Sequence, residues 1–356
     1  MKITLALAGL MAVCIALFPM MCKRNAEKIV QNTQTIQQNA LVQERREESK
    51  KQQTAEKEEK ESENNATKGE EKESADWKPF RILDRSSGKI REVSVKDYVT
   101  GAVCSEMPAT FSSEALKAQA VSAHTWALYC QGQAEKNGQD YDFSADPENW
   151  QGYVTKEQAK ERFGEHFSEY WGKVSRAADE VWEEIAVDSD GEPIVAAYHA
   201  ISSGRTESAE NVWGNAQSCL VPADSSGDIH APGYRKTKTI SPEEVKQCLS
   251  ETGAELPENP QEWFSILERS GSGYVTAVQA GNKQLSGLQL RELLGLRSSD
   301  FEISFENGAF CFTTLGYGHG VGLSQYGADY LARQGKNYRE ILEHYYVGAT
   351  VQKRRL

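Results

Sequence analysis

The chain begins with an uninterrupted apolar run. Residues 3–22 contain no charged side chain, while Lys2 precedes them and Lys23 and Arg24 follow. An apolar helix of about 20 residues can cross a hydrocarbon core about 30 Å thick. No small-residue cleavage motif follows the run and no lipoprotein box interrupts it, so the pattern favours an uncleaved membrane anchor over residues 1–24 rather than a removed signal peptide.

Residues 25–76 form a polar segment. Gln, Glu, Lys, Asn and Ser dominate it, and no aromatic residue occurs between Phe18 and Trp77. The sparse apolar positions do not sustain a heptad repeat and cannot bury a core. The composition therefore predicts a solvated linker that lets the following domain reach away from the bilayer.

The pattern changes at Trp77, where a folded region begins that continues over residues 77–356. Two short apolar runs at 81–84 and 90–93 bracket a Ser-Ser-Gly turn and predict a hairpin. Further helices are predicted over residues 156–187, from Ser241 onward, and over 325–334 and 338–345, and strands over 193–199, 274–278, 301–305 and 310–313. This mixture predicts the α+β class, as a single large domain, with two subdomains as the alternative.

An alanine-rich helix is predicted from Ser113 to Gln131. Glu114 suits its first turn and Gly132 suits its end. Lys117 and His124 fall on one stripe at helical spacing, so both can face the same neighbour.

Charge and cysteine content narrow the range of possible functions and sites. The formal net charge is −12; Lys2 contributes +1 and residues 23–76 contribute −2, which leaves −11 for residues 77–356. Such an acidic domain is a poor partner for nucleic acid. Its five cysteines are widely spaced, odd in number and without C-x-x-C spacing, so they indicate neither a disulfide framework nor a zinc site.

One carboxylate lies in apolar surroundings directly before the alanine-rich helix. Glu106 has Val103, Cys104, Met107 and Phe111 as sequence neighbours. Desolvation raises the pKa of a carboxyl group towards the range that suits a general acid near neutral pH. Glu106 is therefore the candidate proton donor, and a solvated residue in a surface salt bridge is the alternative.

The densest motif is glycine-rich and covers residues 316–328. Five glycines surround His319 at the entrance to a helix, where positive φ angles and free N–H groups favour close approach to a ligand. A nucleotide-binding loop would need a Lys-Ser/Thr ending or G-x-G-x-x-G spacing with a later acidic residue, and both are missing. Candidate site residues are His319, Ser324, Gln325 and Tyr326, with a purely structural glycine turn as the alternative.

A second polar motif follows the predicted strand over residues 193–199. Tyr198, His199, Ser202 and Ser203 precede Gly204 and supply hydroxyls and ring nitrogens suited to binding sugar hydroxyls, although a surface turn would look alike. The G-x-S-x-G pattern of a serine nucleophile elbow is missing.

These motifs resemble, in order and spacing, those of the stage II sporulation protein D family. The likeness extends from about Trp77 to Val351 and includes an N-terminal membrane segment followed by a variable linker. It rests on the sequences EMP at 106–108, EALKAQAV at 114–121, YH with SSG between 198 and 204, and GHGVGLSQYGA at 318–328.

The resemblance implies a peptidoglycan lytic transglycosylase with Glu106 as catalytic acid. Such an enzyme cuts the bond between N-acetylmuramic acid and N-acetylglucosamine in glycan strands, here strands denuded by an amidase, and leaves anhydro-muramic ends. The alternative is a non-catalytic glycan-binding modifier that stimulates an amidase. The residues expected to bind sugars or to hold Glu106 in place are Lys117, His124, Tyr198, His199, Ser202, Ser203, Gly204, His319, Ser324, Gln325 and Tyr326.

The resemblance also implies partners and a location. The expected partners are glycan strands, the sporulation amidase stage II sporulation protein P and the membrane scaffold stage II sporulation protein M. The expected location is the mother-cell membrane during engulfment, with the N-terminus cytoplasmic and the domain outside. Septal wall remodelling during endospore formation would be the setting, and no cofactor is expected.

Two departures from the family pattern stand out. Family members commonly have arginine where this chain has His124, so a fixed positive charge becomes a titratable one. Some relatives bind zinc through a histidine and two cysteines in the loop after this helix, where this chain has Ser144 and Trp150 at the cysteine positions. The histidines also lack H-x-H or H-E-x-x-H spacing, so no metal is expected.

A single carboxylate suffices for a lytic transglycosylase, because it can act first as acid and then as base. A hydrolytic glycosidase needs a second carboxylate at a defined distance from the first. Asp146, Asp224 and Asp228 are the candidates for that second group.

Overall fold

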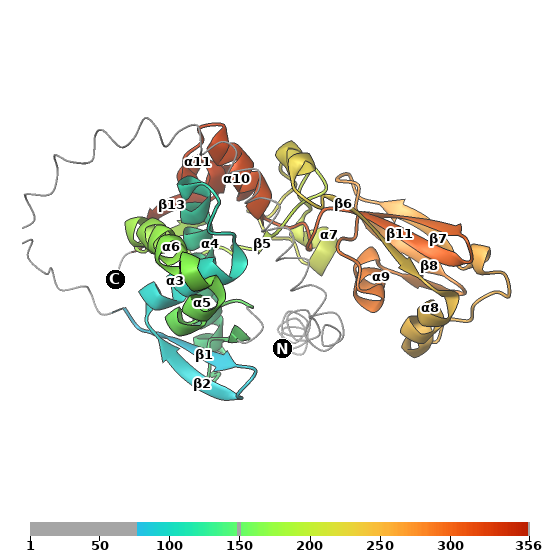
Figure 1. Ribbon diagram of the computed structural model, residues 1–356, viewed down its shortest axis with the longest axis horizontal. Helices are drawn as coiled ribbons and strands as arrows, with labels where there is room; N and C mark the ends of the chain where they lie inside the picture. The colour runs from blue at the N-terminus through green and yellow to red at the C-terminus, as the bar shows by residue number, and fades with distance from the viewer. Residues whose placement is uncertain (1–76, 148–150, 355–356) are drawn as a thin grey trace, which may run out of the picture. The chain divides into compact units, whose positions relative to one another are not determined.

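The computed structural model describes residues 77–147 and 151–354 (Figure 1). Residues 77–356 belong to one structural unit. The expected anchor over residues 1–24, the expected linker over 25–76 and Trp150 lie outside the described residues. Among the described helices, none combines the length and apolar character needed to cross a membrane.

The unit contains two hydrophobic cores, and both combine helices with strands. The elements of the first core and the segments that adjoin it are β1 (Phe80–Asp84), β2 (Lys89–Val93), α3 (Val95–Glu106), α4 (Ser113–Lys136), β3 (Phe143–Ala145), α5 (Lys156–Phe163), α6 (Phe167–Val181), β4 (Glu184–Val187), β5 (Tyr198–His199), α7 (Ala209–Trp213), β12 (Leu323–Ser324), α10 (Gln325–Arg333), α11 (Tyr338–Tyr345) and β13 (Thr350–Lys353). The predicted mixture of helices and strands in a single unit is confirmed.

The second core is built on two three-stranded sheets. Their orders are β7-β8-β9 and β6-β11-β10, and all neighbours in them are antiparallel. The elements are β6 (Arg235–Ile240), α8 (Pro242–Leu249), β7 (Phe264–Arg269), β8 (Val275–Ala280), β9 (Lys283–Leu285), α9 (Gly287–Leu294), β10 (Phe301–Glu306) and β11 (Ala309–Leu315). As predicted, α8 begins directly after Ser241, whose side chain forms a capping box with Glu244.

Helix α4 is the centre of the first core. It packs against α3, α6, α10 and α11, and its alanines at 115, 118, 120, 123 and 127 are buried and permit this close approach. The predicted helix end at Gln131 is wrong, because α4 continues to Lys136 with Gly132 inside it. A single glycine costs a helix only about 1 kcal/mol, and Lys136 suits the last turn of a longer one.

The single helix predicted over residues 156–187 is wrong, because this segment forms two helices and a strand. Gly164 takes a φ of +54° and ends α5, a short 3₁₀ turn follows, and α6 begins at Phe167. The last residues form strand β4, which pairs with β13. Of the predicted strand over residues 193–199, only Tyr198 and His199 form a strand, β5, which pairs with the two-residue β12, and Pro193 forms an isolated antiparallel bridge with Val187.

A pair of glycine substitutions tests how tightly α3 packs against residues 153–154. A Cβ at Gly101 of α3 would clash with the Val154 carbonyl oxygen and the Tyr153 ring, whereas a Cβ at Gly132 of α4 would meet nothing within 4 Å. Gly101→Ala should therefore lower the free energy of unfolding by about 1–3 kcal/mol. Gly132→Ala should raise it by up to about 1 kcal/mol through helix propensity. Chemical denaturation of both variants measures this, and equal effects would contradict the packing described.

Candidate functional site

Glu106 is the last residue of α3, and the residue as a whole is partly exposed although its carboxyl group is surrounded by protein atoms. Its Oε1 accepts a hydrogen bond of 2.9 Å from the backbone N–H of Gly152. Burial raises the pKa of this carboxyl group, and the Gly152 N–H opposes the rise. The physical condition expected of a general acid, a desolvated carboxyl, is therefore present at Glu106.

Two tyrosines lie in the electrostatic field of Glu106. Burial raises the pKa of both Tyr98 and Tyr198 well above the usual value, and the negative charge of Glu106 adds to the effect. The Tyr98 hydroxyl is buried and has no hydrogen-bond partner among the described residues. Tyr198 is the first residue of β5, so the strand that carries the second polar motif runs close to the candidate acid.

The two polar motifs, far apart in the sequence, lie side by side. Strand β5 pairs in parallel with β12, which sets His199 opposite Ser324. Ile201 and Tyr317 exchange backbone hydrogen bonds of 3.0 and 2.7 Å. Gly318 has a φ of +122°, and a Cβ there would lie 2.7 Å from the His199 Cβ. The positive φ angles expected in the glycine-rich motif are thus confirmed, and here they serve close packing against the other motif.

A buried carboxylate joins these motifs. Asp228 is fully buried, and its Oδ2 accepts hydrogen bonds from the Ser202 N–H at 2.7 Å and the Ser225 hydroxyl at 2.9 Å. Its Oδ1 accepts a third from the Ser324 hydroxyl at 2.9 Å. Burial raises the pKa of Asp228, and these hydrogen bonds oppose the rise. From the sequence, Asp228 was a candidate only for the second carboxylate. The signal for its structural role is that buried serine donors from two motifs need a hydrogen-bond acceptor.

The other two candidates for a second carboxylate are differently placed. Asp146 accepts a hydrogen bond of 2.6 Å from the Ser86 hydroxyl, beside the β1–β2 hairpin. Asp224 is exposed and accepts a hydrogen bond of 3.0 Å from the Ser226 hydroxyl.

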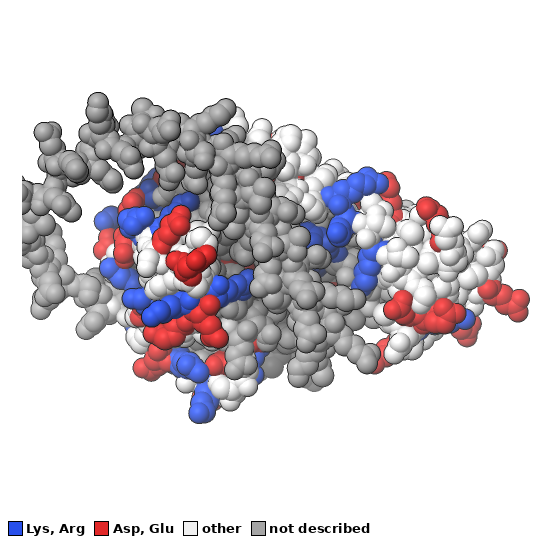
Figure 2. Space-filling model, viewed as in Figure 1, with Lys and Arg blue, Asp and Glu red and all other residues white. Residues whose placement is uncertain are grey.

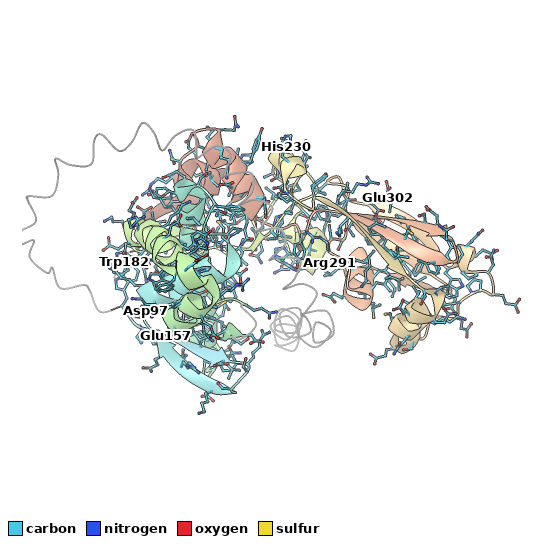
Figure 3. The ribbon with its side chains drawn as sticks, viewed as in Figure 1. Asp97, Glu157, Trp182, His230, Arg291 and Glu302 are labelled. Atoms are coloured by element: carbon cyan, nitrogen blue, oxygen red, sulfur yellow. The ribbon has the colours of Figure 1, made fainter. Side chains whose placement is uncertain are left out.

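The two motif histidines are close to each other and electrically neutral near neutral pH. Their ring centroids are 5.6 Å apart. Nδ1 of His199 donates to the Val321 carbonyl at 3.1 Å, and Nδ1 of His319 accepts from the Val321 N–H at 3.0 Å. Burial is the main cause that lowers their pKa values, to about 4 for His199 and about 3 for His319, with a contribution from Arg291 of α9 (Figure 3). The buried Nε2 of His199 has no hydrogen-bond partner among the described residues.

The glycine-rich motif also contacts the segment that follows Glu106. The Gln325 side chain donates to Gln119 of α4 at 3.3 Å. The ring of Tyr326 meets the ring of Phe111 edge-on, with centroids 4.9 Å apart. Three distant parts of the sequence, around residues 106–119, 198–204 and 318–328, are therefore brought together.

The remaining members of the second motif are held by backbone contacts. Ser203 donates its N–H to the Tyr274 hydroxyl at 3.2 Å, and its carbonyl accepts from the Tyr234 hydroxyl at 2.8 Å. Gly204 has a φ of +106° and donates its N–H to the Ser202 hydroxyl at 3.1 Å. Both residues are partly exposed, but the Ser203 hydroxyl oxygen is buried and has no hydrogen-bond partner among the described residues.

Lys117 and His124 do not face one neighbour, although their helical spacing would allow it. Lys117 forms ion pairs with Glu114 at 2.8 Å and with Glu180 of α6 at 2.5 Å. His124 is completely buried beside Trp77, with ring centroids 5.3 Å apart, and neither ring nitrogen has a hydrogen-bond partner in the described part of the chain. Lys117 and His124 lie on one stripe of α4 but about two helical turns apart, so different elements cover them.

His124 also does not carry the titratable positive charge that was expected near neutral pH. Burial, with a contribution from the nearby Arg354 guanidinium, lowers its pKa to about 3, so the ring is uncharged. Among residues 77–147 and 151–354, no three His, Cys, Asp or Glu side chains are grouped to hold a metal ion.

Comparison with known proteins gives the family. A family model described as "Stage II sporulation protein" matches residues 84–187. Over 273 residues the chain is 35% identical to stage II sporulation protein D of Bacillus amyloliquefaciens, which covers 76% of this chain and 78% of that protein. The chain belongs to the stage II sporulation protein D family. The family member of Bacillus subtilis (strain 168) is 33% identical over 289 residues, covering 81% of this chain and 83% of that one.

A more distant relative of the stage II sporulation protein D family is also similar. The protein named "Amidase enhancer" of Bacillus subtilis (strain 168) is 25% identical over 309 residues, which corresponds to 70% of this chain and 40% of that protein. The predicted family resemblance is thus confirmed, and the segment matched by the family model includes Glu106, Lys117 and His124.

The neutral state of buried His124 predicts acid sensitivity. Between about pH 6.5 and pH 3 the unfolded chain binds a proton at this ring that the folded chain does not, so stability falls as the pH falls. The loss is about 1.4 kcal/mol per pH unit. In His124→Leu, the free energy of unfolding should no longer show this decrease between about pH 6 and pH 4, as measured by denaturation experiments. The surface substitution His230→Leu is the control, and an unchanged slope in His124→Leu would contradict the assignment.

Proposed function

We propose that this protein is a peptidoglycan lytic transglycosylase with Glu106 as its catalytic acid. The observation that carries the proposal is the desolvated carboxyl of Glu106, whose pKa burial raises, beside the two polar motifs of the family. Its substrate would be glycan strands from which an amidase has removed the stem peptides.

The reaction needs one carboxyl group in two roles. Protonated Glu106 donates its proton to the oxygen that links N-acetylmuramic acid to N-acetylglucosamine, and the bond from that oxygen to C1 breaks. The resulting carboxylate takes the proton of the C6 hydroxyl, whose oxygen bonds to C1 and closes the anhydro ring. Glu106 ends protonated, and no water is consumed. The Gly152 N–H on Oε1 would stabilise the carboxylate between the two steps, which leaves Oε2 to carry the proton.

The surroundings of the other carboxylates favour this scheme over hydrolysis. Asp228 is fully buried and accepts three hydrogen bonds, so it is committed to the structure. Asp146 is hydrogen-bonded beside the β1–β2 hairpin, and Asp224 is exposed. A hydrolase would require one of them to direct a water molecule at a defined distance from Glu106.

The exposure of the site residues suggests a division of roles. Tyr198, Gly204, His319 and Tyr326 are partly exposed, and we assign them to sugar contact. The Ser203 hydroxyl is buried, so we assign Ser203 to positioning. Ser202, His199, Ser324 and Gln325 are buried, and with Lys117 and His124 they would hold the contacting groups in place.

A second candidate function is a glycan-binding modifier that stimulates an amidase without cutting strands. The similarity to the protein named amidase enhancer favours it. For either function we propose the same setting: the mother-cell membrane in engulfment, an N-terminal anchor with the domain outside, and a complex with stage II sporulation proteins P and M.

Glu106→Gln tests the proposed chemistry. The amide cannot donate a proton as the acid does, so the rate of forming anhydro ends should fall by about 10²- to 10⁴-fold. Mass spectrometry of digested, peptide-free glycan strands measures it, with the exposed Glu92→Gln as matched control. Full activity in Glu106→Gln would end the proposal, reducing ends would indicate a hydrolase, and intact strands with faster amidase action would indicate the modifier.

The raised pKa of Glu106 also predicts a pH profile. Activity requires the protonated acid at the start, so kcat/KM should be lost as the pH rises through this raised pKa and retained below it. Because the pKa lies above that of an ordinary glutamate, the loss should occur above about pH 4.3. A rate that increases steadily from acidic to neutral pH would contradict Glu106 as the acid.

A further inference from the structure

Arg297 carries a positive charge that no carboxylate of the described residues neutralises. Its guanidinium stacks on the ring of Tyr317 at 4.0 Å from the centroid, and its Nη2 has only a 3.4 Å contact with the Gly233 carbonyl. The buried Nε has no acceptor among residues 77–147 and 151–354. Burial lowers the pKa of Arg297, with the two nearby tyrosines opposing, yet a guanidinium remains charged at every physiological pH.

A desolvated guanidinium presents five N–H donors and normally pairs with a carboxylate. Other partly buried arginines here do so: Arg81 pairs with Asp142, Arg269 with Asp300, and Arg339 with Glu184. A partly exposed Arg297 without such a partner is therefore suited to receive an anion from outside the chain.

Arg297 adjoins the glycine-rich motif of the proposed active site. Its carbonyl accepts a hydrogen bond of 2.9 Å from the N–H of Gly318 in the glycine-rich motif. Its charge also acts on Tyr326, whose ring contacts Phe111, five residues after Glu106. In the space-filling view, basic side chains gather over β6 and α9 on the visible face (Figure 2).

We propose that Arg297 binds the lactyl carboxylate of N-acetylmuramic acid in glycan strands that have lost their stem peptides. The inference rests on the proposed substrate. Amide hydrolysis leaves a free carboxylate on each muramic acid, where an intact strand has a neutral amide. The planar fork of arginine matches a carboxylate with two parallel hydrogen bonds, and an amide offers only one acceptor oxygen. Arg297 thus distinguishes a denuded strand from an intact one before Glu106 acts.

Binding to strands of defined chemistry tests this assignment without turnover. The full-length protein carries Glu106→Gln to keep strands intact, and its affinity is measured for denuded strands, for denuded strands whose lactyl carboxylates have been converted to amides, and for peptide-bearing strands. Denuded strands should bind at least about tenfold more tightly than the amidated ones, as expected for a charge-assisted pair. This comparison requires no change at Arg297.

Variants at Arg297 complete the test. Adding Arg297→Gln should weaken binding to denuded strands about tenfold or more and leave binding to amidated strands unchanged. With Arg297→Lys instead, the affinity for denuded strands should lie between those of Arg297 and Arg297→Gln. Arg354→Gln is the matched control, because Arg354 also stacks on an aromatic ring, that of Trp77 at 4.8 Å, and has a buried nitrogen, Nη1, without a partner among the described residues. It should stay within about twofold of the parent.

Three outcomes would overturn the inference. The first is that Arg297→Gln leaves the affinity for denuded strands unchanged. The second is that Arg297→Gln lowers the affinity for amidated strands as well. The third is that it lowers the affinity only for peptide-bearing strands, which would assign the site to a stem-peptide carboxylate. Failure of the proposed lytic activity is separate, since it appears as absence of anhydro ends with the wild-type protein.

Discussion

The arrangement of the site depends on one buried carboxylate. Asp228 has no access to solvent, so its oxygens must find donors within the protein or the fold bears the cost of an unpaired charge. Its donors come from Ser202, Ser225 and Ser324, which belong to three separate segments. Satisfying one group therefore fixes the register between the two polar motifs, and the parallel pairing of β5 with β12 follows the same constraint.

Desolvation gives the groups around this centre their chemical states. Burial raises the pKa of Glu106 and favours its protonated form, and burial lowers the pKa of His199 and His319 and favours their neutral forms. Near neutral pH the site thus combines a poised acid with uncharged rings that accept and donate hydrogen bonds. Arg297 is the exception, since its guanidinium stays charged and its Nε has no acceptor among the described residues.

Local signals predicted the elements in which sequence and packing agree. The hairpin around Ser86, the capping box of α8 and the positive φ angles of the glycine-rich motif follow from short-range chemistry. The sequence did not predict helix α3: Ser94 caps its N-terminus and Asp97 lies in its first turn, but Gly101 and the β-branched residues disfavour a helix. Burial of Val99 and Val103 against α4 and α6 overrides that preference.

Motif order alone indicated the family, and the chemistry of single side chains indicated the candidate acid and the residue types of the two polar motifs. Tertiary structure decided which side chains meet. It buried His124 beside Trp77, committed Lys117 to ion pairs, made Asp228 a link between motifs and left Arg297 without a carboxylate partner in the described part of the chain. Helical spacing reports the face on which a residue lies, whereas the element that covers that face comes from a distant part of the sequence.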